Sequence, residues 1–474
     1  MESKKWPAVL CLALQACGGG KGSPDAFEEW DPDLFPDSFE VLPADCPEDG
    51  TVSEGFHVSP AGTPEGDGSE TSPWDLATAL AHPIEVEPGD AIWLHGGTYA
   101  GSFTSVLAGA DGSRITVSAY PGERPVIDGA GADETTLSIE GSWTDYRGFE
   151  VTNSWPDRWA GREEGMYVVG EHVRLINLVL HDLGNNGFWT PALDLWIYGC
   201  LIYNNGYDDS DRAHGHGIYT QNLEGTKHIV DNIIFDGYSY GIHAYTEGGS
   251  IQGFDIVGNV WFQSGVAAAG TDTRKDDCLV GGLQPADRVL LQDNMGWADA
   301  WSERSVRLGY EDLVNGSVAL HGNYFAGATI FAAPWTEIEM SGNTFYGEVE
   351  GVDASLYSDN AFLAETERPT GSTVFVRPNL FEPGRAHIVV YNWDLADSVE
   401  VDISGVLDAG ASYKIMNAQD FLSDPVATGV FDGSPVSLPM TGLEPAQPVG
   451  MPDAIDPSET TGPEFNVFVL AGGC

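Results

Sequence analysis

The side chains best suited to proton transfer lie in three short, similar runs near residues 217–221, 241–245 and 306–307 of this 474-residue sequence. His243 titrates near neutrality and can accept a proton, and Tyr219 or Tyr245 can donate or abstract one if a cation lowers its pKa. Arg307 is the nearest candidate for that cation, and it can also neutralise a uronate carboxylate. These four residues suit β-elimination, in which a base removes the proton next to a carboxylate.

Other residues of the same kind of run are typical of sugar binding. Tyr167 and Trp189 can stack on the C–H face of a sugar ring, while Gln221 and His216 can bind hydroxyl groups. We expect a binding groove, because ligand sites combine aromatic side chains with a few convergent polar groups. The alternative is that long loops between the runs fold over these aromatics and bury them.

Three aspartates crowd together just before the run at 217–221, namely Asp208, Asp209 and Asp211. Oxygen clusters of this kind either hold calcium or act as the acid and base of a glycoside hydrolase. Calcium is the one cofactor that the sequence suggests.

The runs alternate between apolar and polar residues with period two, which predicts strands rather than helices. Where a run begins with glycine, the next residue should point into the core and the one after it outward. The predicted inward residues are Met166, Phe188, Ile218, Ile242, Val266 and Val306. The predicted outward column is Tyr167, Trp189, Tyr219, His243, Ala267 and Arg307. Strands of a parallel sheet lie about 4.8 Å apart, so three of them span about 14 Å, or two to three sugar units.

These runs belong to a longer repeat of about 28 residues, a period typical of solenoids. Its turn position is filled by Gly148, Asn177, Cys200, Asn232, Asn259, Asn294, Asn323 and Asn343. Asparagine tolerates the left-handed backbone of a sharp bend, and stacked asparagines can hydrogen-bond between layers. The pattern resembles the asparagine ladder of right-handed parallel β-helices in the pectate-lyase-like superfamily. The resemblance covers about residues 51–350 and implies an all-β fold, a right-handed parallel β-helix solenoid.

Both ends of the predicted solenoid carry further signals. Ser72 followed by Pro73 predicts a helix that starts at Ser72 as N-cap and plugs the open end of the first coil. Beyond Glu367, alternating strands separated by turn signals predict a C-terminal β-sandwich. We therefore divide the chain into a signal peptide (1–17), an acidic linker rich in proline and glycine (18–50), the β-helix (51–365) and the β-sandwich (366–474).

The N-terminus resembles a bacterial lipoprotein signal. Lys4 and Lys5 precede an apolar stretch too short to span a bilayer, and Leu14-Gln-Ala-Cys17 looks like a lipobox. This implies lipidation at Cys17 and a place on the outer membrane or cell surface. The alternative is a plain signal peptide cut nearby, with secretion of the protein.

The formal net charge of −52 excludes partners of the same sign. Nucleic acid is ruled out, and contact with a membrane is expected through the lipid anchor only. Unaided binding of a polyuronate is also disfavoured, so either the substrate is weakly charged or divalent cations bridge it. Adaptation to salty surroundings explains the acidity equally well.

Outside the signal, Cys46, Cys200, Cys278 and Cys474 permit three pairings. Cys200 holds a ladder position and should be a small buried side chain. Cys46 and Cys474 lie near opposite ends of the mature chain and can pair in an extracytoplasmic compartment.

The first function hypothesis is a secreted or surface-anchored β-helix protein, expected as a monomer, that binds a uronate-containing polysaccharide and cleaves it as a lyase. A glycoside hydrolase is the second enzymatic hypothesis. The rival from another class is a non-catalytic glycan-binding adhesin or structural surface protein.

Overall fold

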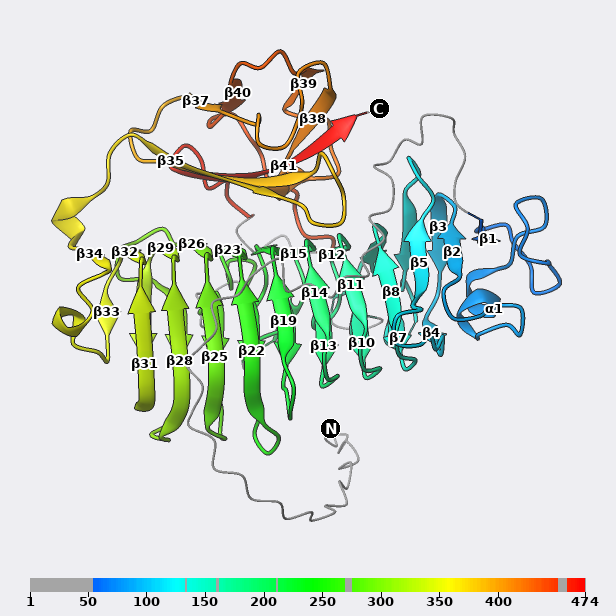
Figure 1. Cartoon of the computed structure of the whole chain (residues 1–474), viewed down its shortest axis with the longest axis horizontal. Helices are drawn as coiled ribbons and strands as arrows, with labels where there is room; N and C mark the ends of the chain where they lie inside the picture. The colour runs from blue at the N-terminus through cyan, green and yellow to red at the C-terminus, as the bar shows by residue number, and fades with distance from the viewer. Residues whose placement is uncertain are drawn as a thin grey trace.

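The computed structural model describes residues 54–132, 134–158, 162–209, 212–268, 275–450 and 458–473. Its main body is a solenoid in which each coil adds one strand to each of three parallel sheets (Figure 1). The ten-stranded sheet consists of β33 (Val349–Glu350), β30 (Ala328–Phe331), β27 (Arg304–Leu308), β24 (Cys278–Val280), β21 (Ile242–Ala244), β18 (Ile218–Thr220), β13 (Phe188–Thr190), β10 (Met166–Val168), β7 (Leu137–Ile139) and β4 (Phe103–Ser105).

The other two parallel sheets each have eleven strands. One, called the flank sheet, consists of β1 (Phe56–Val58), β2 (Ala91–Leu94), β5 (Ile115–Ala119), β8 (Thr144–Arg147), β11 (Arg174–Ile176), β14 (Trp196–Tyr198), β19 (Lys227–Val230), β22 (Ile251–Val257), β25 (Ala286–Gln292), β28 (Asn315–His321) and β31 (Trp335–Ser341). The other, called the docking sheet, consists of β3 (Gly97–Ala100), β6 (Pro125–Asp128), β9 (Glu150–Thr152), β12 (Val179–His181), β15 (Leu201–Tyr203), β20 (Ile233–Phe235), β23 (Val260–Phe262), β26 (Met295–Trp297), β29 (Tyr324–Ala326), β32 (Thr344–Tyr346) and β34 (Ala361–Leu363).

Inward side chains of the three sheets form one continuous apolar core along the solenoid. The predicted strand phase is confirmed for five inward residues, which are fully buried: Met166, Phe188, Ile218, Ile242 and Val306. The prediction for Val266 and Ala267 is wrong. The backbone N–H of Ala268 bonds to the carbonyl of Gly265, which makes a turn there, and the strand of this coil forms later, with Cys278 inward and Leu279 outward. Ala267 is buried instead in a small cluster with Ala213 and Tyr238.

The asparagine ladder is present and extends one rung further than predicted, from Cys200 to Asn360. The side-chain oxygen of each asparagine accepts the backbone N–H of the ladder residue before it, at 2.9–3.0 Å. The left-handed backbone was predicted at the ladder position itself, and this is wrong. It lies in the residue before the ladder position, such as Asp231 (φ 52°). Gly148 and Asn177 hold that earlier position, so they stand one residue outside the ladder.

The N-terminal end of the solenoid carries helix α1 (Leu76–Leu80), three residues later than predicted. Its N-cap is Asp75, whose carboxylate accepts the backbone N–H of Thr78 at 2.7 Å. Ser72 is not the cap, because residues 72 and 74 take part in β-bridges with Ser69 and Val58 and the backbone there is extended. α1 buries Leu76, Ala79 and Leu80 against the first coils, as expected of a cap.

After β34 the chain forms two antiparallel sheets that pack face to face as a sandwich. Their strands are β35 (Ser372–Pro378), β36 (Ala386–Asn392), β41 (Phe465–Gly473), β38 (Ser412–Asn417) and β39 (Ala427–Val430) in one sheet, and β37 (Ser398–Val401) and β40 (Val436–Pro439) in the other. Short 3₁₀ turns lie at Ala354–Leu356, Glu365–Glu367 and Ala418–Asp420. Cys17, Cys46 and Cys474 fall outside the described residues, and Cys200 and Cys278 are buried free thiols.

The sandwich lies on the outer face of the docking sheet (Figure 1). Outward residues of that sheet, including Phe235, Phe262 and Trp297, pack against Tyr391 and Phe465 in a shared apolar cluster. The sandwich therefore covers the outer face of the docking sheet from β12 to β32. No helix within the described ranges is long and apolar enough to cross a membrane.

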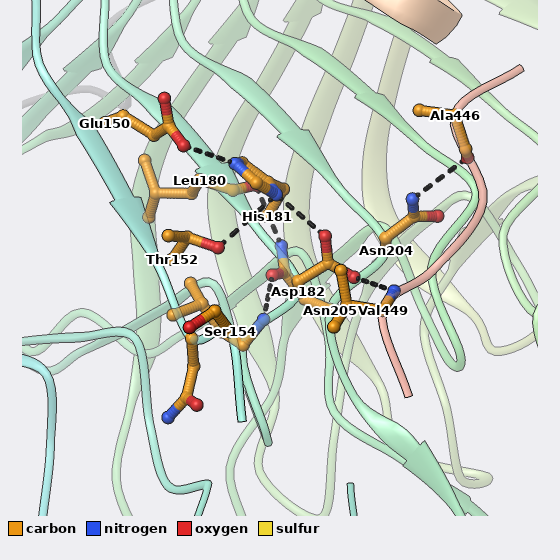
Figure 2. A network of polar contacts seen from close by, with 12 residues as sticks. Glu150, Thr152, Ser154, Leu180, His181, Asp182, Asn204, Asn205, Ala446 and Val449 are labelled. Atoms are coloured by element: carbon orange, nitrogen blue, oxygen red, sulfur yellow. Dashed lines mark hydrogen bonds and ion pairs between the residues drawn. The ribbon is translucent and has the colours of Figure 1, made fainter. Parts of the chain in front are cut away.

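A buried polar network fixes a loop of the sandwich to the solenoid (Figure 2). His181 bonds through Nε2 to Glu150 at 2.9 Å and through Nδ1 to Asp182 at 2.8 Å. Asp182 accepts the backbone N–H of Val449 at 2.7 Å, and Arg158 donates to the carbonyl of Val449 at the same distance. Burial alone would lower the pKa of His181, but its bonds and attraction to the two carboxylates raise it to about 9.

Candidate functional site on the ten-stranded sheet

The outer face of the ten-stranded sheet carries the predicted column of side chains in register. Each residue pairs with the next across neighbouring strands, in the order Tyr167, Trp189, Tyr219, His243, Leu279 and Arg307. Only the fifth position differs from the prediction, with Leu279 in place of Ala267. The sheet therefore brings together Tyr219, His243 and Arg307, as the sequence predicted.

A second column, called the edge column, lies two residues before the start of each strand, beside the first column. Sequence reasoning missed it except at His216. It consists of Glu164, Asn186, His216, Tyr240 and Asp276. In the first four coils the column residue comes directly before a glycine, as in Asn186-Gly187 and His216-Gly217. A Cβ on Gly187 or Gly217 would lie 2.7 Å from the carbonyl oxygen of the next coil, so only glycine fits. The repeated glycine, with a polar or aromatic residue before it, is the signal that could have revealed the column.

His216 and His243 form a pair at the centre of the face. Nε2 of His216 lies 3.1 Å from Nδ1 of His243, and their rings meet edge to face. Burial lowers the pKa of His216 to about 3 and that of His243 well below its usual value. The charge of Arg212 acts in the same direction on both, and His216 adds to the shift of His243. Both imidazoles are therefore neutral at physiological pH.

His243 is more enclosed than the sequence suggested, with 8% of its surface exposed. Tyr240 and Tyr245 stack on its ring at centroid distances of 4.4 and 4.8 Å. Tyr310 continues this aromatic wall by meeting Tyr245 edge to face. The strand phase is right, but the expectation of a freely exposed His243 is wrong, because aromatic neighbours cover it.

Arg307 ends the wall. Its guanidinium lies over the ring of Tyr310 at 4.8 Å and within 4.0 Å of the buried carboxylate of Asp276. The prediction that Arg307 depresses the pKa of Tyr219 or Tyr245 is wrong. Burial, reinforced by acidic neighbours, raises the pKa of both phenols, so each is a proton donor at neutral pH.

Glu164 anchors the other end of the second column. Its carboxylate accepts bonds from the side chains of Asn185 and Asn186, at 2.7 and 3.0 Å, and from the backbone N–H of Asn186. The side-chain oxygen of Asn186 in turn accepts the backbone N–H of His216 at 2.9 Å. Burial nevertheless raises the pKa of Glu164 to about 7. These bonds link Glu164 to the backbone that carries the histidine pair.

The predicted sugar-binding residues lie on the same face but differ in their surroundings. Tyr167 and Trp189 stack on each other at 4.2 Å and are half-buried, so one face of each ring is already used. Gln221 follows Tyr219 and is also half-buried. The backbone carbonyl of Gln221 accepts a hydrogen bond of 2.8 Å from Nζ of Lys227. This lysine is buried inside the solenoid and also bonds to Thr190 and Thr220.

The acidic loop forms a hairpin of β16 (Tyr207–Asp208) and β17 (Ala213–His214) at the entrance to β18. Burial and the neighbouring charge of Asp209 raise the pKa of Asp208, and its Oδ1 is buried without a hydrogen-bond partner. Asp211 lies outside the described residues. Across the part of the chain that is described, no group of three acidic, histidine or cysteine side chains is placed to hold a metal ion.

The solenoid is similar to known proteins. Residues 56–274 match the family described as Pel9A-like, right handed beta helix region. Pectate lyase L of Paenibacillus polymyxa (strain SC2) is 28% identical over 245 residues, which are 47% of this chain and 52% of that protein. Pectate lyase L of Thermoclostridium stercorarium is 31% identical over 178 residues, 34% of this chain and 13% of that protein. The chain thus spans about half, or less, of the length of these curated relatives.

Solved structures similar to the chain include pectate lyase Pel9A and an alginate lyase from Paenibacillus sp. str. FPU-7. The first is 17% identical with a TM-score of 0.43 and covers 62% of this chain and 81% of its own. The second is 18% identical with a TM-score of 0.40 and covers 60% of this chain and 96% of its own. The three parallel sheets and the asparagine ladder make the solenoid a parallel β-helix, and its residues 56–274 match the Pel9A-like right-handed β-helix family.

Proposed function

We propose that this protein is a polysaccharide lyase that cleaves a uronate-containing glycan by β-elimination on the outer face of the ten-stranded sheet. The observation that carries the proposal is the neutral His216–His243 pair, with the phenol of Tyr219 beside it at a ring distance of 5.4 Å from His243. The family match over residues 56–274 includes the coils that carry the pair, and relatives named pectate lyase support the proposal.

In the proposed step, His243 takes the proton from C5 of a uronate residue. The electron pair of that C–H bond forms the C4=C5 double bond, and the C4–O bond to the next sugar breaks. Tyr219 donates its phenolic proton to the leaving oxygen, and the proton on His243 then returns to Tyr219, which restores both groups. Arg307 binds the uronate carboxylate and stabilises the charge that develops on it.

The charge distribution around the pair is compatible with an anionic ring at this position. Arg212 and Arg307 both act on the pKa of His243, so two of the 20 lysine and arginine residues of the chain lie near it. Local cations of this kind offset the net charge of −52 over short distances, because salt screens the more distant carboxylates.

Calcium binding at Asp208, Asp209 and Asp211 stays a prediction. The orphaned Oδ1 of Asp208 suits a cation, but the two described carboxylates do not make a site by themselves. The step above therefore uses side chains alone. Anchoring of the protein to the outer membrane or cell surface through Cys17 is likewise a proposal, and it rests on the lipobox.

The test is ultraviolet absorbance of the conjugated double bond, measured over a panel of uronate-containing polysaccharides with wild-type protein and His243→Ala. The matched control is His172→Ala, a histidine that stacks on Trp143 at 4.1 Å, where both residues lie just before strands of the flank sheet. We expect new absorbance with wild type and control and none with His243→Ala. Release of reducing ends without absorbance would point to a hydrolase, and glycan binding without any product to an adhesin. Either result overturns the proposal.

A further inference from the structure

A hollow of about 330 Å³ opens on the ten-stranded sheet beyond Arg307. It is lined by Lys275, Ser302, Glu303, Arg304, Ile330, Glu348 and Glu350. Ile330 and Glu350 are the next two residues of the outward column, because Arg307 pairs with Ile330 and Ile330 with Glu350. The hollow therefore continues the same face that holds the histidine pair.

The position of the hollow fits a bound polysaccharide. His243, Leu279, Arg307 and Ile330 stand on four successive strands. Three strand spacings of about 4.8 Å put Ile330 about 14 Å from His243, the length of two to three sugar units. A chain cleaved at His243 and running along the column would reach the hollow with its second or third sugar.

The lining of the hollow is acidic, with an apolar floor. Three carboxylates, from Glu303, Glu348 and Glu350, face two cations. Nε of Arg304 also lies 2.8 Å from the buried carboxylate of Asp276. The half-buried side chain of Ile330 supplies an apolar surface on which the C–H face of a sugar ring can rest.

We infer that the hollow over Ile330 binds a sugar residue that carries no carboxylate, so that the substrate is a heteropolysaccharide and not a homopolyuronate. This inference rests on the proposed function. A carboxylate placed there would meet three glutamates and two cations, one of which is also paired with Asp276, and the excess of like charge at close range disfavours binding. A uronate bound at Arg307, followed by an uncharged sugar over Ile330, matches the cation at the first position and the acidic lining at the second. The strongly acidic chain can then bind its substrate without covering it with positive charge.

The test compares two glycans, a homopolyuronate and a polymer in which uronate alternates with a neutral sugar. Wild-type protein should cleave the alternating polymer with the higher kcat/KM. The double variant Glu348→Gln, Glu350→Gln should raise kcat/KM on the homopolyuronate at least about fivefold at low salt and leave the alternating polymer nearly unchanged. Oligosaccharides too short to reach the hollow should not respond, which makes them the internal control.

Equal preference of the wild type for both glycans, or a double variant with an unchanged ratio, would overturn the inference while the lyase proposal stands. If neither glycan is cleaved, the lyase proposal fails. Binding of the two glycans to wild type and double variant, measured by calorimetry, then tests the hollow by itself. Tighter binding of the homopolyuronate than of the alternating polymer by wild type would contradict it, and the reverse order, lost in the double variant, would support it.

Discussion

Nε2 of His216 and Nδ1 of His243 lie 3.1 Å apart, although the residues belong to different coils and are separated by 27 positions. One proton can be shared in this contact while both rings stay neutral, so His216 sets which nitrogen of His243 carries the hydrogen. The pair joins the two columns of the face, with His216 in the edge column and His243 in the outward column.

Replacing His243 by alanine should lower kcat at least about 100-fold, the lower range for loss of a general base. Because the ring is buried between Tyr240 and Tyr245, the variant should also lose about 1 kcal/mol of unfolding free energy, more than a freely exposed residue would. Steady-state kinetics and thermal melting measure the two effects. Ile242→Asp is the contrast, since it buries an unpaired carboxylate and should unfold the coil. Equal destabilisation by both changes would contradict the inside-outside assignment of this strand.

The strand phase could be predicted from sequence because a period of two decides which side chains face a continuous apolar core, and five of six inward residues follow it. Val266 failed because a glycine followed by valine also fits a turn, and only contacts with Tyr238 and Ala213 of the neighbouring coil decide between the two. Helix α1 began later than predicted for a similar reason, since bridges at Ser72 and Trp74 compete with the helical start.

The site itself was predicted only in part. The alternation along a strand predicts which residues form the outward column. It does not predict the partners of His243, which depend on the register between coils and on loops whose length varies from one coil to the next. Tyr240 and Asp276 precede their strands by the same spacing as His216, yet their types differ, and Asp276 lacks the glycine that follows Tyr240 and His216. The enclosure of His243 and the raised pKa values of the tyrosines follow from burial, which a period of two does not reveal.

Replacing Asn259 tests how much the asparagine ladder contributes to stability. It is fully buried, and its side-chain oxygen accepts both the backbone and the side-chain N–H of Asn232, while its own amide donates to Ile229. Asn259→Leu should cost about 2–4 kcal/mol of unfolding free energy, because several buried groups lose their partners. Gln252→Leu, at a half-buried position of the flank strand β22, is the control and should cost less. Thermal or urea unfolding measures both, and equal losses would remove the special role of the ladder.

Calcium should raise the melting temperature if the hairpin aspartates bind it, since a ligand that binds only the folded state stabilises it by mass action. Asp208→Asn should abolish the increase, because Oδ1 of Asp208 is the buried oxygen without a partner. Differential scanning calorimetry with calcium and with chelator measures this. Identical melts in the two conditions would leave these aspartates without a metal role.

Cys17→Ala should release the protein from the membrane fraction in a bacterial host. Several acyl chains at about 0.8 kcal/mol per buried CH₂ hold a protein firmly, so the loss of the anchor should be plain. Fractionation followed by immunoblotting measures it, and Cys11→Ala, inside the signal, is the control. Unchanged membrane association of the Cys17 variant would exclude lipidation as the anchor.

The network around His181 makes stability depend on pH in a defined window. The groups that face it are Glu150 and Asp182, which are themselves paired with Arg124 and Arg158. The folded pKa of His181, about 9, lies above the ordinary value of 6.5 that it regains on unfolding. The stabilisation is therefore fully present below about pH 6.5 and is lost as the pH rises through about 9.

Wild-type protein should lose up to about 3 kcal/mol of unfolding free energy between these pH values through His181, as the difference between the two pKa values implies. His181→Gln should be less stable at low pH and should not show this decline, because glutamine cannot carry the proton that both carboxylates attract. Unfolding in urea at several pH values, followed by tryptophan fluorescence, measures the two slopes. Parallel pH curves for wild type and variant would show that His181 is neutral in the folded protein, and that the loop at Val449 is held by Asp182, Arg158 and Arg162 without a charge on His181.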